Sequence, residues 1–274
     1  MPVLVIAFVL LFFFGLLLFF IAPNNKERED IHIFEQQYIA HRGLFDTNGK
    51  APENTLPAFS LAIENHYGIE LDVQMTKDNK LVVFHDEDLN RMCGVDKKLI
   101  DCSFEELQEY SIGSSDEHIP LFDDVLSLIQ GKAPLIVEIK SYGNWKETTR
   151  RTALRLDDYN GKYCIESFHP FVVHWYKKNR PSVIRGQLSS NGFKYDLDLS
   201  ITEKFLLTNL LLNFLARPDF IAYEHKYANN FCYTVCRKLF KVTNAAWTIR
   251  SQDDLEKAKK IFSVIIFDSF IPNN

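Results

Sequence analysis

Acidic, histidine and basic residues recur in this sequence in short groups beside apolar runs. Five such groups follow one another: His41-Arg42-Gly43, Pro52-Glu53-Asn54-Thr55, Glu70-Leu71-Asp72, His85-Asp86 and Glu138-Ile139-Lys140. Most of them lie at the carboxyl end of a β-branched or aromatic run, which is where a parallel α/β barrel builds its active site. Two imidazoles, several carboxylates and two cations at one edge indicate metal-assisted phosphoryl chemistry.

Strand-like runs that could position these groups alternate with helical patterns. The candidate strands are Tyr38–Ala40, Ile69–Val73, Leu81–His85, Leu135–Ile139, Tyr163–Ser167, Val183–Leu188, Phe220–Tyr223, Ala245–Ile249 and Val264–Phe267. Helical patterns such as Leu56–Asn65, Asp123–Ile129 and Asp253–Phe262 separate them, which predicts a parallel sheet with crossover helices. If Leu81–His85 forms a hairpin with the preceding strand, the remaining units fit a TIM (β/α)8 barrel; a doubly wound open sheet is the alternative.

Two segments depart from this alternation. Residues 86–120 are polar and too long for an ordinary barrel loop, so they predict a small insertion over the site. Phe205–Leu215 is apolar almost all round a helix, which predicts a buried barrel helix. The second interpretation of this segment is a surface that touches lipid near an anchor.

The N-terminus carries the other clear signal. From Val3 to Ala22 every residue is apolar or glycine, and a helix rising about 1.5 Å per residue would just cross a hydrocarbon core of about 30 Å. A cleaved signal peptide is the alternative, but its basic start, short apolar run and small-residue cleavage site are missing. We therefore expect a single-pass membrane protein with a transmembrane helix at 1–23, a linker at 24–37 and one α/β domain at 38–274. Lys26 and Arg28 follow the helix, and the positive-inside rule favours a cytoplasmic domain.

Composition narrows the class of protein. The net charge is -5, from 31 basic and 36 acidic residues, and the chain has no basic stripe with interleaved aromatic residues, so nucleic acid is not an expected partner. Five cysteines at irregular spacing argue against a disulfide framework and for a reducing compartment.

Taken in order, the five groups resemble the glycerophosphodiester phosphodiesterase family. Ser167-Phe168 and Trp247-Thr248 extend the resemblance, which runs from Tyr38 to Asp268. It implies a TIM barrel with a small insertion after the hairpin of the second strand. It also implies an enzyme that binds a divalent cation and hydrolyses glycerophosphodiesters to sn-glycerol 3-phosphate and an alcohol.

The resemblance further implies a role for each matching residue. The metal ligands would be three carboxylates, those of Glu70, Asp72 and Glu138. The acid/base pair would be His41 and His85, and the phosphate contacts would be Arg42 and Lys140. Glu53 would support the metal and the first histidine. Trp247 would line the glycerol pocket, with a plain core tryptophan as the alternative.

The residue types suit these roles. A phosphodiester monoanion repels nucleophiles, so its oxygens must be neutralised, and a divalent cation with Arg and Lys does this. Glu70 and Asp72 are two apart on a strand and point to the same side, inward if Leu71 and Val73 pack outward. Such close like charges favour a cation, and carboxylate oxygens suit Mg²⁺ or Ca²⁺. An imidazole can take or give a proton, each role being worth about 10²–10⁴-fold. The attacking oxygen is either the substrate's own neighbouring hydroxyl or water.

Other functions fit parts of the same pattern. An anchored barrel could cleave lysophospholipids in a phospholipase D manner, or it could be a non-catalytic binding protein tethered to the membrane. A phosphatidylinositol-type phospholipase C or a sphingomyelinase D-like enzyme is less favoured, because of the Pro52–Thr55 run and the polar insertion. Two departures from the family pattern, His169 after Ser167-Phe168 and the ending Phe267-Asp268-Ser269, bear on substrate preference more than on activity.

Overall fold

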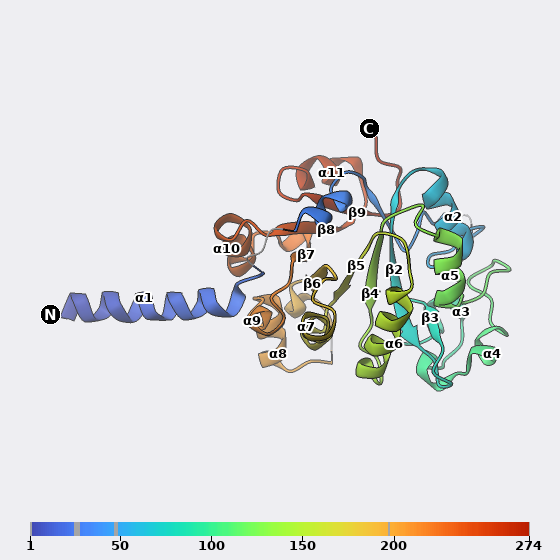
Figure 1. Cartoon of the computed structure of the whole chain (residues 1–274), viewed down its shortest axis with the longest axis horizontal. Coiled ribbons are helices and arrows are strands. Elements are labelled where there is room, and N and C mark those ends of the chain that lie inside the picture. The colour runs from blue at the N-terminus through green and yellow to red at the C-terminus, as the bar shows by residue number, and fades with distance from the viewer. Residues whose placement is uncertain (1, 25–27, 47–48, 197, 274) are drawn as a thin grey trace.

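The computed structural model describes residues 2–24, 28–46, 49–196 and 198–273, and within them a nine-stranded sheet closes into a barrel (Figure 1). Its parallel strands are β1 (Ile39–His41), β2 (Gly68–Met75), β4 (Leu135–Ile139), β5 (Tyr163–Ser167), β6 (Arg185–Ser189), β7 (Phe220–Glu224), β8 (Thr243–Ile249) and β9 (Val264–Phe267). The barrel is closed because β1 pairs with both β2 and β9. The remaining strand, β3 (Leu81–Val83), is antiparallel to β2, so the predicted TIM barrel with a hairpin on its second strand is confirmed.

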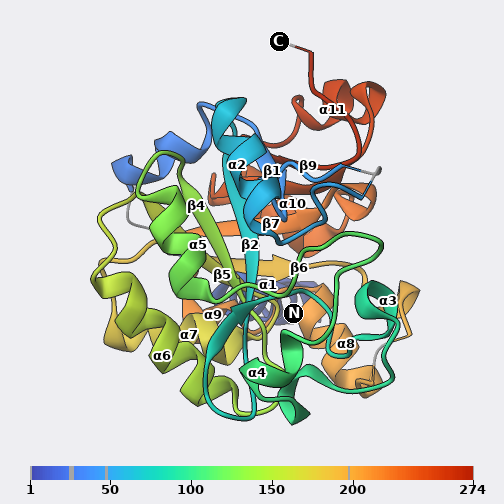
Figure 2. The same cartoon turned by 90° about the vertical axis from the view of Figure 1, so that its right-hand side faces the viewer.

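Helices cover the outside of this barrel, as Figures 1 and 2 show. They are α2 (Leu56–Glu64), α5 (Phe122–Ile129), α6 (Trp145–Asp157), α7 (Pro170–Asn179), α8 (Ile201–Thr208), α9 (Asn213–Ala216), α10 (Phe231–Leu239) and α11 (Gln252–Ala258). Short 3₁₀ turns occur at η1 (Glu29–Phe34), η3 (Gly192–Lys194) and η4 (His225–Tyr227). The helices predicted around Leu56, Asp123 and Asp253 lie within about two residues of their expected starts.

The alternation of residues along each strand separates the core from the site. In β2, Ile69, Leu71 and Val73 belong to the apolar core between the sheet and the helices. The intervening Glu70 and Asp72 therefore face the barrel interior, as expected. The amino-terminal part of the interior is apolar instead, with Ile39, Ile136, Phe220 and the η1 residues Ile31 and Phe34 in one cluster. Polar groups are thus concentrated at the carboxyl ends of the strands.

The polar segment between β3 and α5 carries its own structure. It contains α3 (Asn90–Cys93), η2 (Leu99–Asp101) and α4 (Phe104–Leu107), and Ser103 and Glu106 form a capping box at the start of α4. A separate apolar cluster holds it together: Val82, Phe84, Leu89, Leu99, Cys102, Leu107, Ile112 and Ile119. The segment is therefore a small subdomain with its own core, placed after the second-strand hairpin.

The expectation of one buried helix at Phe205–Leu215 is wrong. The segment is divided between α8 and α9, because Leu210 adopts the left-handed conformation (φ 57°) between them. Its apolar side chains have two partners in different directions: Leu210 packs into the barrel core, while Phe214 packs against Phe19 and Phe20 of the N-terminal helix. Phe205 faces outward and is exposed. A single straight helix could not meet both partners.

The N-terminal helix, α1 (Pro2–Ile21), extends away from the domain in Figure 1. It is long and apolar enough to span a membrane, and most of it is exposed. Only its last turn packs on the domain, where Ile21 is fully buried. The Ile21 carbonyl accepts hydrogen bonds from Asn213 Nδ2 at 3.1 Å and from the Cys236 thiol at 3.3 Å. All five cysteines lie in the described part of the chain and are free thiols.

Docking of the last turn of α1 should contribute to the stability of the domain. Replacing buried Ile21 with alanine removes apolar contacts and leaves a cavity, so we expect Ile21→Ala to cost about 2–4 kcal/mol. Near-UV circular dichroism of the full chain in detergent micelles would show this as a lower midpoint of thermal unfolding. Phe13→Ala, at an exposed position of the same helix, should leave the midpoint unchanged. Equal midpoints for the two variants would show that α1 does not contribute to domain stability.

Candidate active site

Three buried carboxylates form the centre of the site. Glu70 and Asp72 come from β2 and Glu138 from β4, and one oxygen of each lies within 4.8 Å of the others. The strand register explains this proximity, because Asp72 lies beside Glu138 in the parallel pair. All three side chains point into the barrel, so their charges are close together and poorly hydrated. Such a group needs cations nearby.

Side-chain cations lie against this cluster, and the crowding shifts the pKa values of its carboxyl groups. The Lys140 ammonium lies 2.7 Å from Asp72 Oδ1 and 2.8 Å from Glu138 Oε1. Burial alone would raise the pKa of Asp72, but Lys140, His85 and Arg42 hold it well below its usual range. Burial, with Asp72 and Glu138 nearby, raises the pKa of Glu70 well above its usual range. The crowding therefore favours the protonated form of Glu70 over its carboxylate.

The turn after β1 points a backbone donor at Glu70. Arg42 takes a positive φ of 58°, and its N–H donates to Glu70 Oε2 at 3.0 Å. Gly43 follows at φ 82°, where a Cβ atom would lie 2.9 Å from the backbone of Ala58. Asn54, also at positive φ, donates from Nδ2 to Asp72 Oδ2 at 2.8 Å. The groups around His41-Arg42-Gly43 and Asn54 are thus turns that orient polar groups toward the carboxylates.

His41 lies at the end of β1, and one of its ring nitrogens is hydrogen-bonded. Its Nδ1 is 2.9 Å from Asp268 Oδ2, and its Nε2 is 3.9 Å from Glu70 Oε2. Burial raises the pKa of Asp268 less than His41, Arg250 and Ser269 lower it, so its carboxylate is ionised and can only accept a hydrogen bond. His41 Nδ1 therefore carries the proton, and Nε2 presents its lone pair to the site. Burial and then the charge of Arg42 lower the pKa of His41 to about 4, so the ring is neutral at pH 7.

The second histidine is held by a chain of charges that begins in the inserted subdomain. His85 Nδ1 lies 2.6 Å from Asp86 Oδ1, and Arg91 of α3 donates to the other oxygen of Asp86 at 2.6 Å. Arg91 also binds both oxygens of Glu53, at 2.6 and 3.0 Å. Glu53 in turn accepts from Arg42 at 2.7 Å. The insertion is therefore linked electrostatically to both histidine-bearing segments.

Aromatic residues lie on the other side of the barrel opening. Trp247 of β8 meets the edge of Phe168 at 5.4 Å between ring centroids, and it is the register neighbour of Glu224. Tyr195 donates its hydroxyl to Glu224 Oε2 at 2.6 Å, and Ser190 Oγ also contacts this oxygen. This arrangement gives a partly apolar wall with one carboxylate, a suitable surface for a small alcohol or an amine.

The structure brings together the residues named from the sequence, but two of them contact other side chains than expected. Lys140, expected at the phosphate, pairs with Asp72 and Glu138. Glu53, expected to support the metal and the first histidine, pairs with Arg42 and Arg91. Four residues were not named as site residues: Asn54, Arg91, Glu166 and Asp268. Glu166 is the inward residue of β5 beside Glu138, and the available signal was a glutamate inside the candidate strand Tyr163–Ser167. Burial, then Glu138 and Asp72, raise the pKa of Glu166 well above its usual range.

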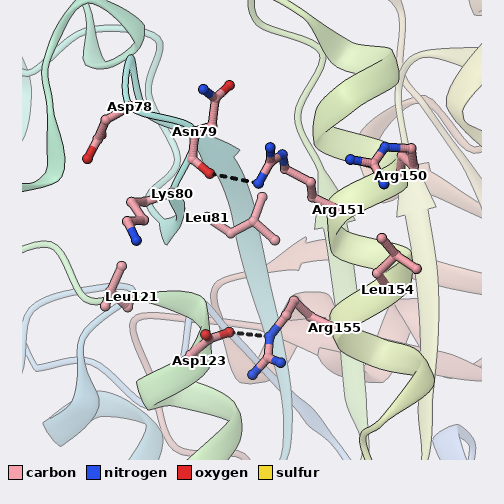
Figure 3. A pocket seen from close by; sticks show the side chains of 10 residues that line it. All are labelled: Asp78, Asn79, Lys80, Leu81, Leu121, Asp123, Arg150, Arg151, Leu154 and Arg155. Carbon is pink, nitrogen blue, oxygen red and sulfur yellow. Dashed lines mark hydrogen bonds and ion pairs between the residues drawn. The ribbon is translucent and has the colours of Figure 1, made fainter.

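A cavity of about 460 Å³ lies elsewhere, between the β2–β3 hairpin, α5 and α6 (Figure 3). Its arginine side chains already have partners: Arg155 donates to Asp123 at 2.6 Å, Arg151 to the carbonyl of Asn79 at 3.4 Å, and Arg150 to Glu147. None of the three central carboxylates lines it. This cavity is therefore separate from the carboxylate cluster at the barrel opening.

The donor set at the opening fits a divalent cation. Glu70, Asp72 and Glu138 offer hard carboxylate oxygens that already lie close together, and these are the ligands that Mg²⁺ and Ca²⁺ prefer. Burial and neighbouring carboxylates raise the pKa of Glu70, and Glu166 Oε2 is buried without a hydrogen-bond partner, so a cation here would offset a local excess of negative charge. The acidic triad is thus a possible metal site.

Comparisons with known proteins agree with this geometry. A glycerophosphodiester phosphodiesterase of Caldanaerobacter subterraneus subsp. tengcongensis is 30% identical over 235 residues, covering 81% of this chain and 89% of that protein. The human protein named lysophospholipase D GDPD1 is 32% identical over 124 residues, 40% of this chain and 38% of that protein. The structure of an Oleispira antarctica phosphodiesterase in complex with the product sn-glycerol-3-phosphate superposes with a TM-score of 0.68 at 23% identity, covering 85% and 92% of the two chains, which supports the fold.

The sequence model of the glycerophosphoryl diester phosphodiesterase family matches residues 41–265, which is most of the domain. The match begins at His41 and includes all three central carboxylates and the β8 tryptophan. The resemblance seen in the sequence is confirmed, and the chain belongs to the glycerophosphoryl diester phosphodiesterase family of enzymes.

Proposed function

We propose that this protein hydrolyses glycerophosphodiesters to sn-glycerol 3-phosphate and an alcohol, by histidine acid/base catalysis with a divalent cation. The observation that supports this most is His41: its Nε2 lone pair faces the buried carboxylate triad, and its other nitrogen is fixed by Asp268. A neutral, oriented imidazole beside a metal-binding cluster suits cleavage of a phosphodiester.

Glu70, Asp72 and Glu138 would hold the cation, Mg²⁺ or Ca²⁺. When bound, it would neutralise charge on the phosphoryl oxygens as the transition state forms. Arg42 and Lys140 add positive charge at the same place. Both already lie against the carboxylates, with Lys140 Nζ between Asp72 and Glu138, so they need only share their charge with an incoming phosphate.

The two histidines divide the proton transfers. His41 is neutral at pH 7, so its Nε2 can take the proton of the attacking oxygen, while the Asp268 carboxylate stabilises the imidazolium that forms. His85 is held through Nδ1 by Asp86, which leaves its Nε2 available to give a proton to the departing alcohol. Trp247 and Phe168 would enclose the glycerol end and exclude water from that side.

Cleavage of lysophospholipids is the second candidate function. The exposed apolar helix α1 favours it, because we propose that α1 is retained as a single membrane span that holds the barrel at a lipid surface. The human relative carries a lysophospholipase D name. Of the two basic residues used for the orientation, Lys26 lies outside the described residues, while Arg28 binds Asp30. We keep the proposal of a cytoplasmic domain on the charge rule alone.

The reaction is tested by release of sn-glycerol 3-phosphate from glycerophosphocholine by the full chain in detergent. We expect Mg²⁺ or Ca²⁺ to support it and EDTA to stop it. His41→Asn and His85→Asn should each lower kcat by about 10²–10⁴-fold, the usual worth of a general acid or base. His66→Asn, at an exposed position, is the matched control and should remain active.

Substrate choice is read in the same assay. Choline released from lysophosphatidylcholine, with little from glycerophosphocholine, would favour the second candidate. A metal-independent activity, or full activity of both histidine variants, would exclude the proposed mechanism.

Cation affinity should depend on pH through Glu70. Because burial and neighbouring carboxylates raise the pKa of Glu70, a cation that binds its carboxylate form competes with a proton. The affinity should therefore rise with pH, by up to about tenfold per unit while the pH is below that pKa. Isothermal titration calorimetry in two buffers of different ionisation enthalpy measures both affinity and proton release.

Glu70→Gln should remove most of the affinity and the proton release together. Glu109→Gln, an exposed glutamate in the insertion, should change neither. Binding of unchanged strength across the pH range, with no proton released, would exclude Glu70 as the titrating ligand.

Asp268 should control the pH dependence of the reaction through His41. Its carboxylate raises the pKa of His41, so Asp268→Asn should lower that pKa and move the acidic limb of the kcat profile to lower pH. The maximal kcat should fall by roughly 10²–10⁴-fold, because the correct tautomer and the imidazolium lose their support. KM should change little.

Ser269→Ala is the control for this prediction. It removes another hydrogen bond to Asp268, at 2.8 Å, but leaves the bond to His41. A profile of Asp268→Asn that matches that of the wild type would show that the contact is structural only.

A further inference from the structure

The junction between α1 and the domain is fixed by side chains of the domain. Arg217 donates to the carbonyls of Phe19 and Ala22 at 3.1 and 2.8 Å, so the last carbonyls of the helix are satisfied by the barrel rather than by water. The Asn24 N–H continues the contact to the carbonyl of Pro218 at 2.8 Å. The direction in which α1 leaves the barrel is therefore set by α9 and α10.

The length of α1 sets the depth of this junction. Its 20 residues, at about 1.5 Å each, only just equal a hydrocarbon core of about 30 Å, so a spanning α1 must use its last turn as well. That last turn packs on Phe214 of α9 and on the Cys236 thiol of α10. Elements that contact the last turn must then lie at the boundary of the bilayer.

Apolar side chains are exposed on two helices near this boundary. In Figure 1, α8 and α10 lie on either side of the place where α1 leaves the domain. Ile201 and Phe205 are one turn apart on α8 and are 79% and 52% exposed; Phe231 and Leu239 are two turns apart on α10 and are 61% and 57% exposed. Spacings of four and eight residues put each pair on one helix face. Contiguous exposed apolar patches mark interaction surfaces, and these two pairs beside the end of α1 are candidates for one.

Positive charge is concentrated in the same part of the chain. Residues 170–241 contain 11 Lys and Arg but 5 Asp and Glu, whereas the whole chain has 31 and 36. Within the described ranges, Lys204 of α8, Lys238 of α10 and Lys241 after it form no ion pair. Apolar residues with unneutralised lysines beside them suit a membrane surface that carries anionic lipid.

We propose that the exposed faces of α8 and α10, near the place where α1 leaves the domain, form a contact surface for an anionic phospholipid bilayer. This rests on the proposed membrane span of α1. The face adjoins the barrel opening, because Ser189 at the end of β6 donates to the carbonyl of Leu207 in α8 at 2.8 Å. The surface holds one rim of the opening against the lipid headgroups, where a single-chain phospholipid can enter without first crossing water.

The contact is tested in the full chain reconstituted into vesicles of phosphatidylcholine with phosphatidylglycerol. Cys93 is replaced by serine, because the other four cysteines are buried, and single cysteines are placed by Phe205→Cys, Leu239→Cys, Leu154→Cys and Leu10→Cys. Each is labelled with nitrobenzoxadiazole, and its quenching by spin-labelled lipid is measured. We expect at least about twofold stronger quenching at positions 205 and 239 than at 154, and less of it when phosphatidylglycerol is left out.

Leu154 is the matched control, because it is an exposed leucine on α6, away from α1. Leu10 reports the span itself: no quenching there would exclude the proposed anchor, whereas quenching at 10 but not at 205 and 239 would exclude only the contact surface. Shielding of position 205 in every lipid without quenching would identify a protein partner, such as a second copy, and overturn the proposal. Equal quenching with and without phosphatidylglycerol would exclude the preference for anionic lipid. Hydrolysis of soluble glycerophosphocholine, measured on the same samples, tests the proposed reaction separately.

Discussion

The mutual repulsion of Glu70, Asp72 and Glu138 is the constraint on which the rest of the site depends. Three carboxylates within 4.8 Å of one another in a buried barrel cannot all be charged without compensation. The Lys140 ammonium offsets the charges of Asp72 and Glu138, and the backbone N–H of Arg42 donates a hydrogen bond to Glu70. The positive φ of Arg42 points its N–H at Glu70, and glycine follows because the turn passes close to the backbone of Ala58.

The inserted subdomain extends the same electrostatic balance away from the centre. Arg91 of α3 is shared between Glu53 and Asp86, so one guanidinium fixes both the partner of Arg42 and the partner of His85. The apolar cluster beneath the insertion gives α3 a fixed place from which to do this. The insertion is therefore part of the site rather than a cover over it, and its position determines how His85 is oriented.

The sequence predicts the barrel and its central carboxylates because both depend on local patterns. Alternation in β2 places Glu70 and Asp72 inward, and a strand ending places His41 at the opening. The site residues that the sequence did not reveal depend on contacts between distant segments. Asp268 is 227 residues from His41, and only closure of the barrel between β1 and β9 brings them together. The Phe205–Leu215 prediction failed for a related reason, since apolar periodicity does not reveal that half of the segment packs on α1.

The contacts of Asp268 give the unusual segment after β9 a role other than the one expected from the sequence. Read from the sequence, the Phe267-Asp268-Ser269 ending bears on substrate preference, yet its carboxylate fixes the tautomer of His41 and is itself held by Arg250 at 2.9 Å and by Ser269. A carboxylate held by two other donors cannot rotate freely, so it holds the imidazole in one orientation. The orientation of His41 at the end of β1 is therefore set by the residue that follows the last strand, so closing the barrel and fixing this imidazole are one structural event.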